Sequence, residues 1–135
     1  MSLFKVFDIS GSALYAQSVR LNTTASNMAN VDSISSSTAT TYRSRQPVFS
    51  AQMDEAGEEV SGVNVLGIVE SQAPLQRQYR PDHPLADKAG YVNLPNVNPV
   101  EEMANMISAS RSYQSNVEVL NTSKQMLMRT LALGE

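Results

Sequence analysis

The stretch NPVEEMANMISASRSYQSNVEVLNTSKQMLMRTLALG, residues 98–134, decides the fold because it predicts one long helix with clear ends. Asn98 offers a side chain that caps a helix, Pro99 suits the first helical position, and Glu101 follows three residues after the cap. Gly134 is a natural stop. Such a helix would be about 52 Å long at 1.5 Å per residue. No globule of this size can cover that length.

One face of this helix is marked by steps of three and four residues. The positions on that face are Met103, Met106, Ser110, Tyr113, Val117, Leu120, Lys124, Leu127 and Leu131. The N-terminal segment has the same spacing, with small residues at alternate positions: Phe4, Phe7, Gly11, Leu14, Ser18, Leu21, Ala25 and Met28. This is the a/d spacing of a coiled coil, although an amphipathic helix folded onto its own domain explains the N-terminal segment equally well. Gly11 costs about 1 kcal/mol relative to Ala, so the first ten residues are expected to form a looser piece.

The middle of the chain is of a different kind. All six prolines fall between positions 47 and 99, and proline disrupts helix interiors because it removes a donor and clashes with the preceding turn. Gln46–Met53 predicts one strand, and Val60–Val69 predicts a second strand with a bend at Gly67. Residues 33–41 have the composition of a small-polar linker.

These patterns together predict a mainly α fold in three parts. An N-terminal helix is expected within 1–31, a middle segment with a linker and short β-strands within 32–98, and a C-terminal helix within 99–135. Two narrow apolar faces at opposite ends of a small chain need partners to cover them. The chain is therefore expected to be part of an assembly.

Composition and charge exclude several classes of function. The formal net charge is −3 and no segment concentrates positive charge, so no nucleic-acid partner is expected. The absence of cysteine excludes disulfides, thiolate metal sites and cysteine nucleophiles. The sequence has no long apolar run and no cleavable signal peptide at its N-terminus, so neither a membrane span nor a cleaved signal is expected.

Catalytic and metal-binding patterns are equally absent. His83 is the only histidine, and because only carboxylates remain as further ligands, a turn residue is the favoured interpretation. The acidic residues 54–59 lack the ligand spacing of an EF-hand loop, so a solvated turn is favoured there. Neither Gly-x-Ser-x-Gly nor a glycine-rich phosphate loop occurs. We predict that the chain is not an enzyme and uses no cofactor or metal.

Several motifs carry a resemblance to a known family. Residues 21–30, LNTTASNMAN, look like the N-terminal signature shared by bacterial flagellar rod and hook proteins. The match extends through GYVNLPNVN at 90–98, Glu102-Met103, SASRSYQSN at 108–116 and Tyr79-x-Pro81-x-His83-Pro84-x-Ala86-Asp87. The chain resembles the flagellar basal-body rod protein family at both termini and from about residue 79 onward. It departs at Asp32-Ser33, where the family continues with Thr-x-Gly-aromatic.

This resemblance implies a structural function. The N- and C-terminal helices would pair as an antiparallel coiled coil, and the units would stack into the periplasmic (proximal) rod that transmits torque from motor to hook. Its partners would be copies of itself, other rod proteins, the basal-body membrane-ring adaptor and, during secretion, the flagellar type III export apparatus. Export by that route, without a cleaved signal peptide, would place the chain in the flagellar basal body.

The resemblance and the spacing together predict which residues form the contacts between the helices and between subunits. The seam between the helices is assigned to Leu14, Leu21, Met28, Met106, Tyr113, Val117, Leu120 and Leu127. Capping or inter-subunit hydrogen bonds are assigned to Asn27, Asn30, Asn98 and Asn116, with simple helix termination at 27–31 an equal alternative.

A different class of function is the main alternative. A free-standing helical adaptor or export chaperone would be a defined small oligomer with formed helices before any partner binds. A rod subunit would instead be a monomer whose termini order on assembly. A hydrolase built on the middle segment lacks the residues it would need.

Overall fold

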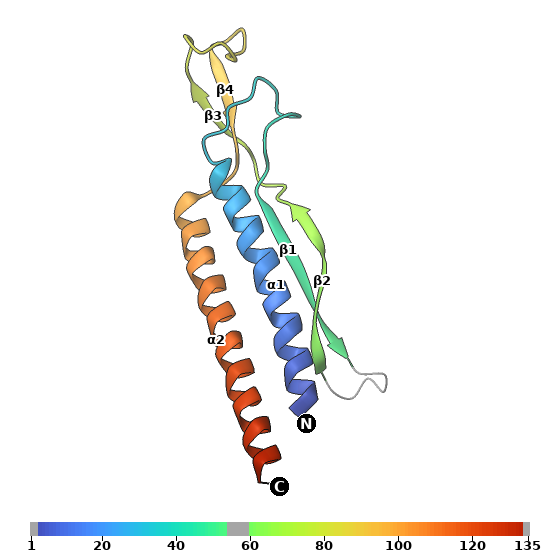
Figure 1. Cartoon of the computed structure of the whole chain (residues 1–135). Coiled ribbons are helices and arrows are strands. Elements are labelled where there is room, and N and C mark those ends of the chain that lie inside the picture. The colour runs from blue at the N-terminus through green and yellow to red at the C-terminus, as the bar shows by residue number, and fades with distance from the viewer. Residues whose placement is uncertain (1–2, 54–59, 134–135) are drawn as a thin grey trace.

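The computed structural model describes residues 3–53 and 60–133 (Figure 1). The described elements are α1 (Leu3–Ala29), β1 (Arg45–Met53), β2 (Val60–Glu70), β3 (Gln76–Tyr79), β4 (Tyr91–Leu94) and α2 (Pro99–Ala132). The two helices run side by side in opposite directions, so that α1 begins and α2 ends at the same end of the molecule. The predicted mainly helical fold with a small antiparallel β middle is confirmed. The acidic turn predicted at 54–59 and the stop at Gly134 lie outside the described residues.

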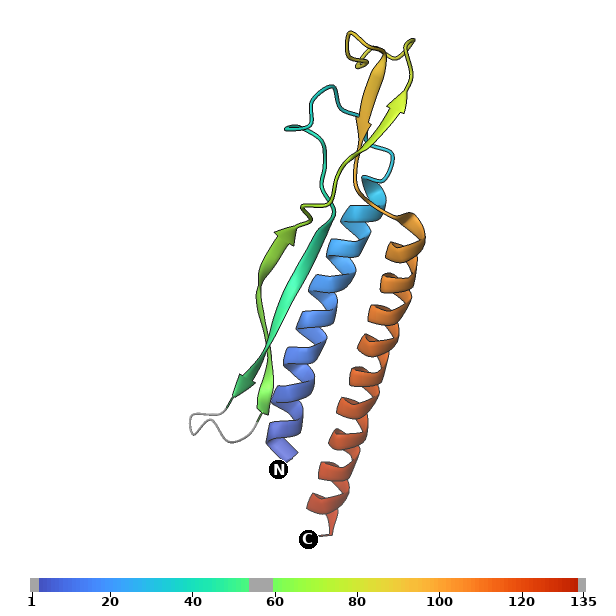
Figure 2. The same ribbon diagram turned by 180° about the vertical axis from the view of Figure 1, so that it is seen from behind.

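The two β hairpins have different positions. β1 and β2 pair antiparallel and lie along α1, which therefore packs against α2 on one side and this hairpin on the other (Figure 2). β3 and β4 pair antiparallel beyond the helices, at the end opposite the helix termini described above. The predicted strands are confirmed but were expected to be short, whereas β1 has 9 residues and β2 has 11. The bend predicted at Gly67 is a shift of register between Val48 and Phe49 of β1, opposite Gly67.

The N-terminal helix is continuous, so the prediction of a looser first piece is wrong for the described residues. α1 runs from Leu3 through Gly11 to Ala29 without a break. Gly11 faces open space, while its neighbours hold the helix in place: Ser10 is buried, and the Ser12 hydroxyl accepts a hydrogen bond from the Val63 amide of β2 at 3.0 Å. Packing on both sides offsets the low helix propensity of glycine.

The interior is built mostly from small and polar side chains. The buried apolar residues are few (Ala16, Val92, Val97 and Ala109), and the buried polar residues are more numerous: Ser10, Thr23, Thr24, Asn27, Thr41, Ser44, Asn93, Glu102 and Ser123. Many large apolar side chains are exposed instead. Small side chains let the backbones of α1, α2 and the β1–β2 hairpin approach closely.

The buried face of α2 is rotated from the one that the spacing predicted. Its buried residues Glu102, Ala109 and Ser123 recur at multiples of seven residues. On the predicted face, Met103 is 53% exposed and Leu131 is 62% exposed. Two of the three buried residues, Ala109 and Ser123, are small, and small residues permit a shorter distance between helices than large apolar ones. The spacing of apolar residues therefore predicted positions beside the buried face of α2 rather than the buried face itself.

Candidate functional site

Asn27, near the end of α1, is the most connected polar side chain at the upper end of the helix pair. Its Oδ1 accepts hydrogen bonds from the Arg45 amide at 2.9 Å and from the Tyr42 hydroxyl at 2.8 Å. Its Nδ2 donates to the Arg45 carbonyl oxygen at 2.8 Å. The side chain is 1% exposed. Asn27 therefore joins α1 to the start of β1 within one chain, rather than capping a helix or facing another subunit as predicted.

Ser44 extends this connection to two further segments. Its amide donates to Oδ1 of Asn96 at 2.8 Å, and its carbonyl oxygen accepts from the Ser71 amide at 2.8 Å. The Asn96 Nδ2 in turn donates to the Ala73 carbonyl oxygen at 2.9 Å. We call Asn27, Ser44, Asn96 and Glu102 the polar junction. It ties the end of α1, the start of β1, the segment after β2 and the segment before α2 to one another.

Glu102 belongs to the first turn of α2 and is 5% exposed. Burial raises the pKa of its carboxyl group, and the neighbouring Glu101 adds to the rise, while hydrogen bonds from Asn27 and Ser44 favour the charged form and oppose it. No ion pair found in the described part of the chain includes Glu102. A buried carboxylate held by neutral donors alone is an uncommon arrangement.

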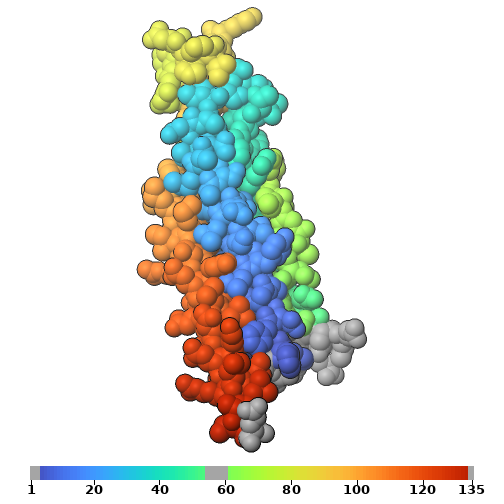
Figure 3. All heavy atoms as spheres, in the orientation of Figure 1, coloured from blue at the N-terminus to red at the C-terminus, as the bar shows by residue number. Residues whose placement is uncertain are grey.

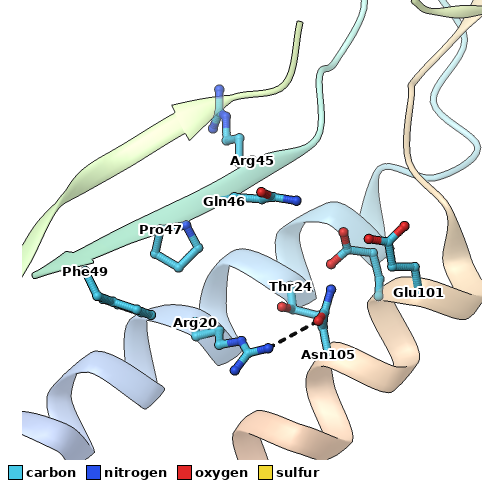
Figure 4. Close-up of a pocket in the computed structure, with 9 residues that line it drawn as sticks. Arg20, Thr24, Arg45, Gln46, Pro47, Phe49, Glu101 and Asn105 are labelled. Carbon is cyan, nitrogen blue, oxygen red and sulfur yellow. Dashed lines mark hydrogen bonds between the residues drawn. The ribbon is translucent and has the colours of Figure 1, made fainter. Parts of the chain in front are cut away.

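An open groove of about 330 Å³ lies over α1, between β1 and the start of α2 (Figure 4). One guanidinium nitrogen of Arg20 donates to the Asn105 side-chain oxygen at 3.2 Å across it. The groove is lined by Arg20, Thr24, Arg45, Gln46, Pro47, Phe49, Glu101, Glu102 and Asn105. Its wall is therefore mostly polar and charged.

The tip, which we define as β3, β4 and the loop 80–90 between them, is held by Asp87. One carboxylate oxygen accepts from the Ala89 and Tyr91 amides, each at 2.9 Å, and the other accepts from Arg77 at 2.9 Å. The hydrogen bond from the Tyr91 amide is the main reason that the pKa of Asp87 lies below its usual value. The Arg77 guanidinium also lies 4.8 Å from the centre of the Tyr91 ring. Loop 80–90 is thus a defined structure, with Gly90 at φ +81° closing it.

The other predicted site residues lie in less constrained places. The predicted seam residues Leu14, Leu21, Met28, Met106, Val117, Leu120 and Leu127 are half-buried, and Tyr113 is 38% exposed. Asn98 accepts from the Val100 amide at 3.1 Å and the Glu101 amide at 3.4 Å, and so caps α2. Asn30 and Asn116 each donate to a carbonyl oxygen four residues earlier, Ser26 and Ser112 respectively.

Comparison with known proteins covers the whole chain. Two family models match: "Flagella basal body rod protein" over residues 7–33 and "Flagellar basal body rod FlgEFG protein C-terminal" over 88–133. The flagellar basal-body rod protein FlgC of Salmonella typhimurium is 54% identical over 136 aligned residues, with 100% of both chains covered. FlgC of Escherichia coli O6:H1 is 54% identical over 136 residues and FlgC of Yersinia enterocolitica 53% over 135, again with full coverage of both chains.

This chain belongs to the FlgC family. It is a structural subunit of the flagellar basal-body proximal rod. The resemblance drawn from the sequence motifs is confirmed. The FlgC relatives cover the region from about residue 79 onward, and one of the two family models matches 88–133 of it. The part of the chain that the structure describes contains no helix long and apolar enough to cross a membrane.

Sequence reasoning missed two functional features of this FlgC-family chain. Glu102 entered only as part of the family motif and Ser44 not at all, because a glutamate in a first helical turn and a serine just before a strand carry no distinct sign of burial. Asp87 entered only as part of the family motif that begins at Tyr79. The run Asp87-Lys88-Ala89-Gly90 did offer a signal, since an aspartate that accepts from amides two or more residues ahead, followed by a glycine, is typical of a tight turn.

Proposed function

We propose that this chain polymerises, with copies of itself and other rod proteins, into the periplasmic shaft that transmits torque from the motor to the hook. The observation that carries this proposal is the apolar surface of α2. Large apolar side chains that stand more than one-third exposed on this helix are Val100, Met103, Ile107, Tyr113, Val119, Met126, Met128 and Leu131. Exposed apolar surface on this scale marks an interaction site.

Rigidity is the property that such a shaft needs. Each methylene group buried between subunits adds about 0.8 kcal/mol, so an apolar helix face shared with neighbours resists separation under torque. The side chains that the monomer leaves exposed on α2 are those that neighbouring subunits would cover. Methionine at three of these positions, Met103, Met126 and Met128, suits contacts with neighbours that are not identical, because its side chain adapts its shape.

The helix pair would work as an antiparallel coiled coil. Glu102, Ala109 and Ser123 lie at multiples of seven residues along α2 and are buried, which is the repeat of that structure. The half-buried residues predicted for the seam, Leu14, Leu21, Met28, Met106, Val117, Leu120 and Leu127, together with Tyr113, would flank this line of buried residues. Asn30 and Asn116 would remain available for inter-subunit contacts through their unshared side-chain oxygens.

We further propose the division of the chain into a helix-pair domain, formed by 1–31 and 99–135, and a middle segment, 32–98, that makes the outer contacts. Secretion through the flagellar type III export apparatus, without a cleaved signal peptide, would bring the chain to the periplasmic space. The membrane-ring adaptor of the basal body would be its partner at the base of the rod. No enzymatic activity is proposed. The described residues contain no group of three or more histidine, aspartate or glutamate side chains placed to hold a metal ion.

The deciding experiment replaces one exposed apolar side chain of α2 with a charge. In a strain lacking its own FlgC, the wild-type chain should restore swimming and rod-bearing basal bodies, and Ile107→Asp should abolish both. Ile107 is 56% exposed in the monomer, so the purified variant should keep its helical content and melting temperature.

The matched control is Gln125→Asp, which places the same charge at an exposed polar position of α2. It should swim as the wild type does. Normal swimming of Ile107→Asp would show that the apolar face of α2 is not covered in the rod, and the proposal would then lose its main support.

A further inference from the structure

The charged residues that line the groove over α1 leave it with a net negative charge. Of its charged lining residues, Arg45 pairs with Glu70 of β2 at 3.1 Å and adds no net charge. Arg20 contributes +1 and Glu101 and Glu102 contribute −2, which leaves −1. Glu102 is 5% exposed, and buried carboxylates are normally paired with a cation. The groove is open, so that a cation from outside the chain can reach its acidic wall.

The tip carries the complementary charge. Its charged residues are Arg77, Arg80, Asp82, Asp87 and Lys88, which sum to +1. Arg77 is occupied by Asp87 at 2.9 Å, whereas Arg80 is exposed and belongs to no ion pair found among the described residues. Figure 3 shows the tip at one end of the molecule, beyond the helices. Ser35, in the segment between α1 and β1, pairs with Asn93 of β4.

The tip is also ordered before it meets any partner. The Arg80 amide donates to the Gly90 carbonyl oxygen at 2.8 Å, and Asp87 fixes the other side of the loop through the Ala89 and Tyr91 amides. A preformed loop presents its side chains at little cost in conformational entropy. Arginine suits a carboxylate partner better than lysine does, because its planar guanidinium forms two parallel hydrogen bonds.

We propose that Arg80, on the tip of one copy of this chain, enters the groove of a second copy and pairs with the carboxylates of Glu101 and Glu102. This inference rests on the proposed polymerisation. A groove of about 330 Å³ lies at the lower end of the range for small-ligand sites, and therefore suits one side chain rather than a helix. Tip and groove are different surfaces of the molecule, so the contact is head-to-tail and repeats along a series of subunits.

A charge exchange tests the pairing in cells that lack their own FlgC. Arg80→Glu and Glu101→Arg should each lower the number of rod-bearing basal bodies by about tenfold or more, because like charges would then face each other. The double variant, in which the charges are exchanged, should recover most of the loss. Both positions are exposed in the monomer, so that neither change alters the folded chain.

Cross-linking tests the same contact without touching either partner of the ion pair. The chain has no cysteine, so Asp82→Cys on the tip and Gln46→Cys on the groove wall introduce the only thiols. Mild oxidation of assembled rods should link copies into covalent multimers. The control, Asp82→Cys with Gln125→Cys, should give monomers.

Each other outcome overturns the inference in a recognisable way. Loss of rods with Glu101→Arg but not with Arg80→Glu would show that a different rod protein occupies the groove. Normal rods with both single variants would show that the groove is not an interface. In either case the proposed polymerisation stands if Ile107→Asp still abolishes swimming. A wild-type chain that forms no rods would instead remove the proposed function itself.

Discussion

The two helices of this FlgC-family chain differ in how much of their surface the chain itself covers. α1 lies between α2 and the β1–β2 hairpin, and among its described side chains only Phe4 and Tyr15 are large, apolar and exposed. α2 packs against α1 alone and exposes eight such side chains between Val100 and Leu131. The inner helix is therefore largely covered by its own chain, and the outer helix is not. We propose that neighbouring subunits cover the outer helix.

This difference separates two kinds of substitution. Changes around α1 and the polar junction should alter the stability of the monomer, because their partners lie within the chain. Changes on the outer face of α2 should leave the monomer intact and alter assembly. A variant that changes both the stability of the monomer and its assembly would contradict this separation, and a variant that changes only one of them would support it.

The largest effect is expected from breaking α2 itself. Leu120→Pro removes a backbone donor in the middle of a 34-residue helix and should cost about 3 kcal/mol or more. The variant should be secreted but should restore neither swimming nor rods in a strain lacking FlgC. Leu120→Ala, which keeps the helix, is the control and should retain some swimming. Normal swimming of Leu120→Pro would mean that α2 is dispensable, and the distinction between the helices would have no functional meaning.

A smaller but still substantial effect is expected at the polar junction. Asn27→Ala would remove the acceptor of the part-buried Arg45 amide, and a donor left unsatisfied away from water costs about 1–3 kcal/mol. The Tyr42 hydroxyl would also lose this acceptor but would keep the Ser26 hydroxyl as a partner at 3.2 Å. Chemical denaturation of the purified monomer should show the loss directly. Asn30→Ala is the matched control, since the half-buried Asn30 side chain, in the turn after α1, donates only to the nearby Ser26 carbonyl oxygen. Equal destabilisation by the two variants would contradict the intrachain role of Asn27.

The helices and strands of the fold could be predicted from the sequence. Asn98 and Pro99 mark the start of α2 through local chemistry that needs no tertiary partner, and the structure places the helix start at Pro99. The prolines confine the strands to the middle for an equally local reason. The bend at Gly67 was predictable because glycine inside a strand often marks an irregularity.

The contacts between side chains of different elements could not be predicted from the sequence. Hydrophobic spacing assumes that large apolar residues are the most buried, and here Ala109 and Ser123 occupy the line of contact while Met103 faces outward. In the proposed assembly, neighbouring subunits would cover the large residues that the isolated subunit exposes. Asn27 and Glu102 meet across 75 residues of sequence, and only the packed structure brings them together.

A third prediction uses the pH dependence of the monomer. Because burial raises the pKa of Glu102 in the folded chain, its stabilising contribution is fully present below the unfolded value of about 4.3 and is lost as pH rises through the folded value. Glu102→Gln keeps the shape of the side chain without the titration. The variant should therefore gain stability relative to the wild type as pH increases from about 4 towards neutrality, as measured by urea midpoints.

Glu118→Gln is the control for the loss of a carboxylate from α2, because Glu118 is exposed. Its urea midpoint at neutral pH should stay close to that of the wild type. A constant difference between Glu102→Gln and the wild type across the range would show that Glu102 is not held in a raised-pKa environment. The polar junction would then perturb the pKa of Glu102 less than the burial of this side chain indicates.

The smallest effect is expected at the tip, which belongs to neither helix. The pKa of Asp87 is lowered, chiefly by the Tyr91 amide, so its contribution is present above the unfolded value of about 3.9 and is lost as pH falls through the lower folded value. At neutral pH, Asp87→Asn should speed hydrogen exchange at the Ala89 and Tyr91 amides while the unfolding midpoint stays unchanged, because Asp87 is exposed to solvent. Asp82→Asn, on the same loop, should leave both amides protected. A shift of the global midpoint with Asp87→Asn would show that the tip is coupled to the helix pair through the junction. The tip would then contribute to the stability of the monomer, as the surroundings of α1 do, and would not be an independent surface.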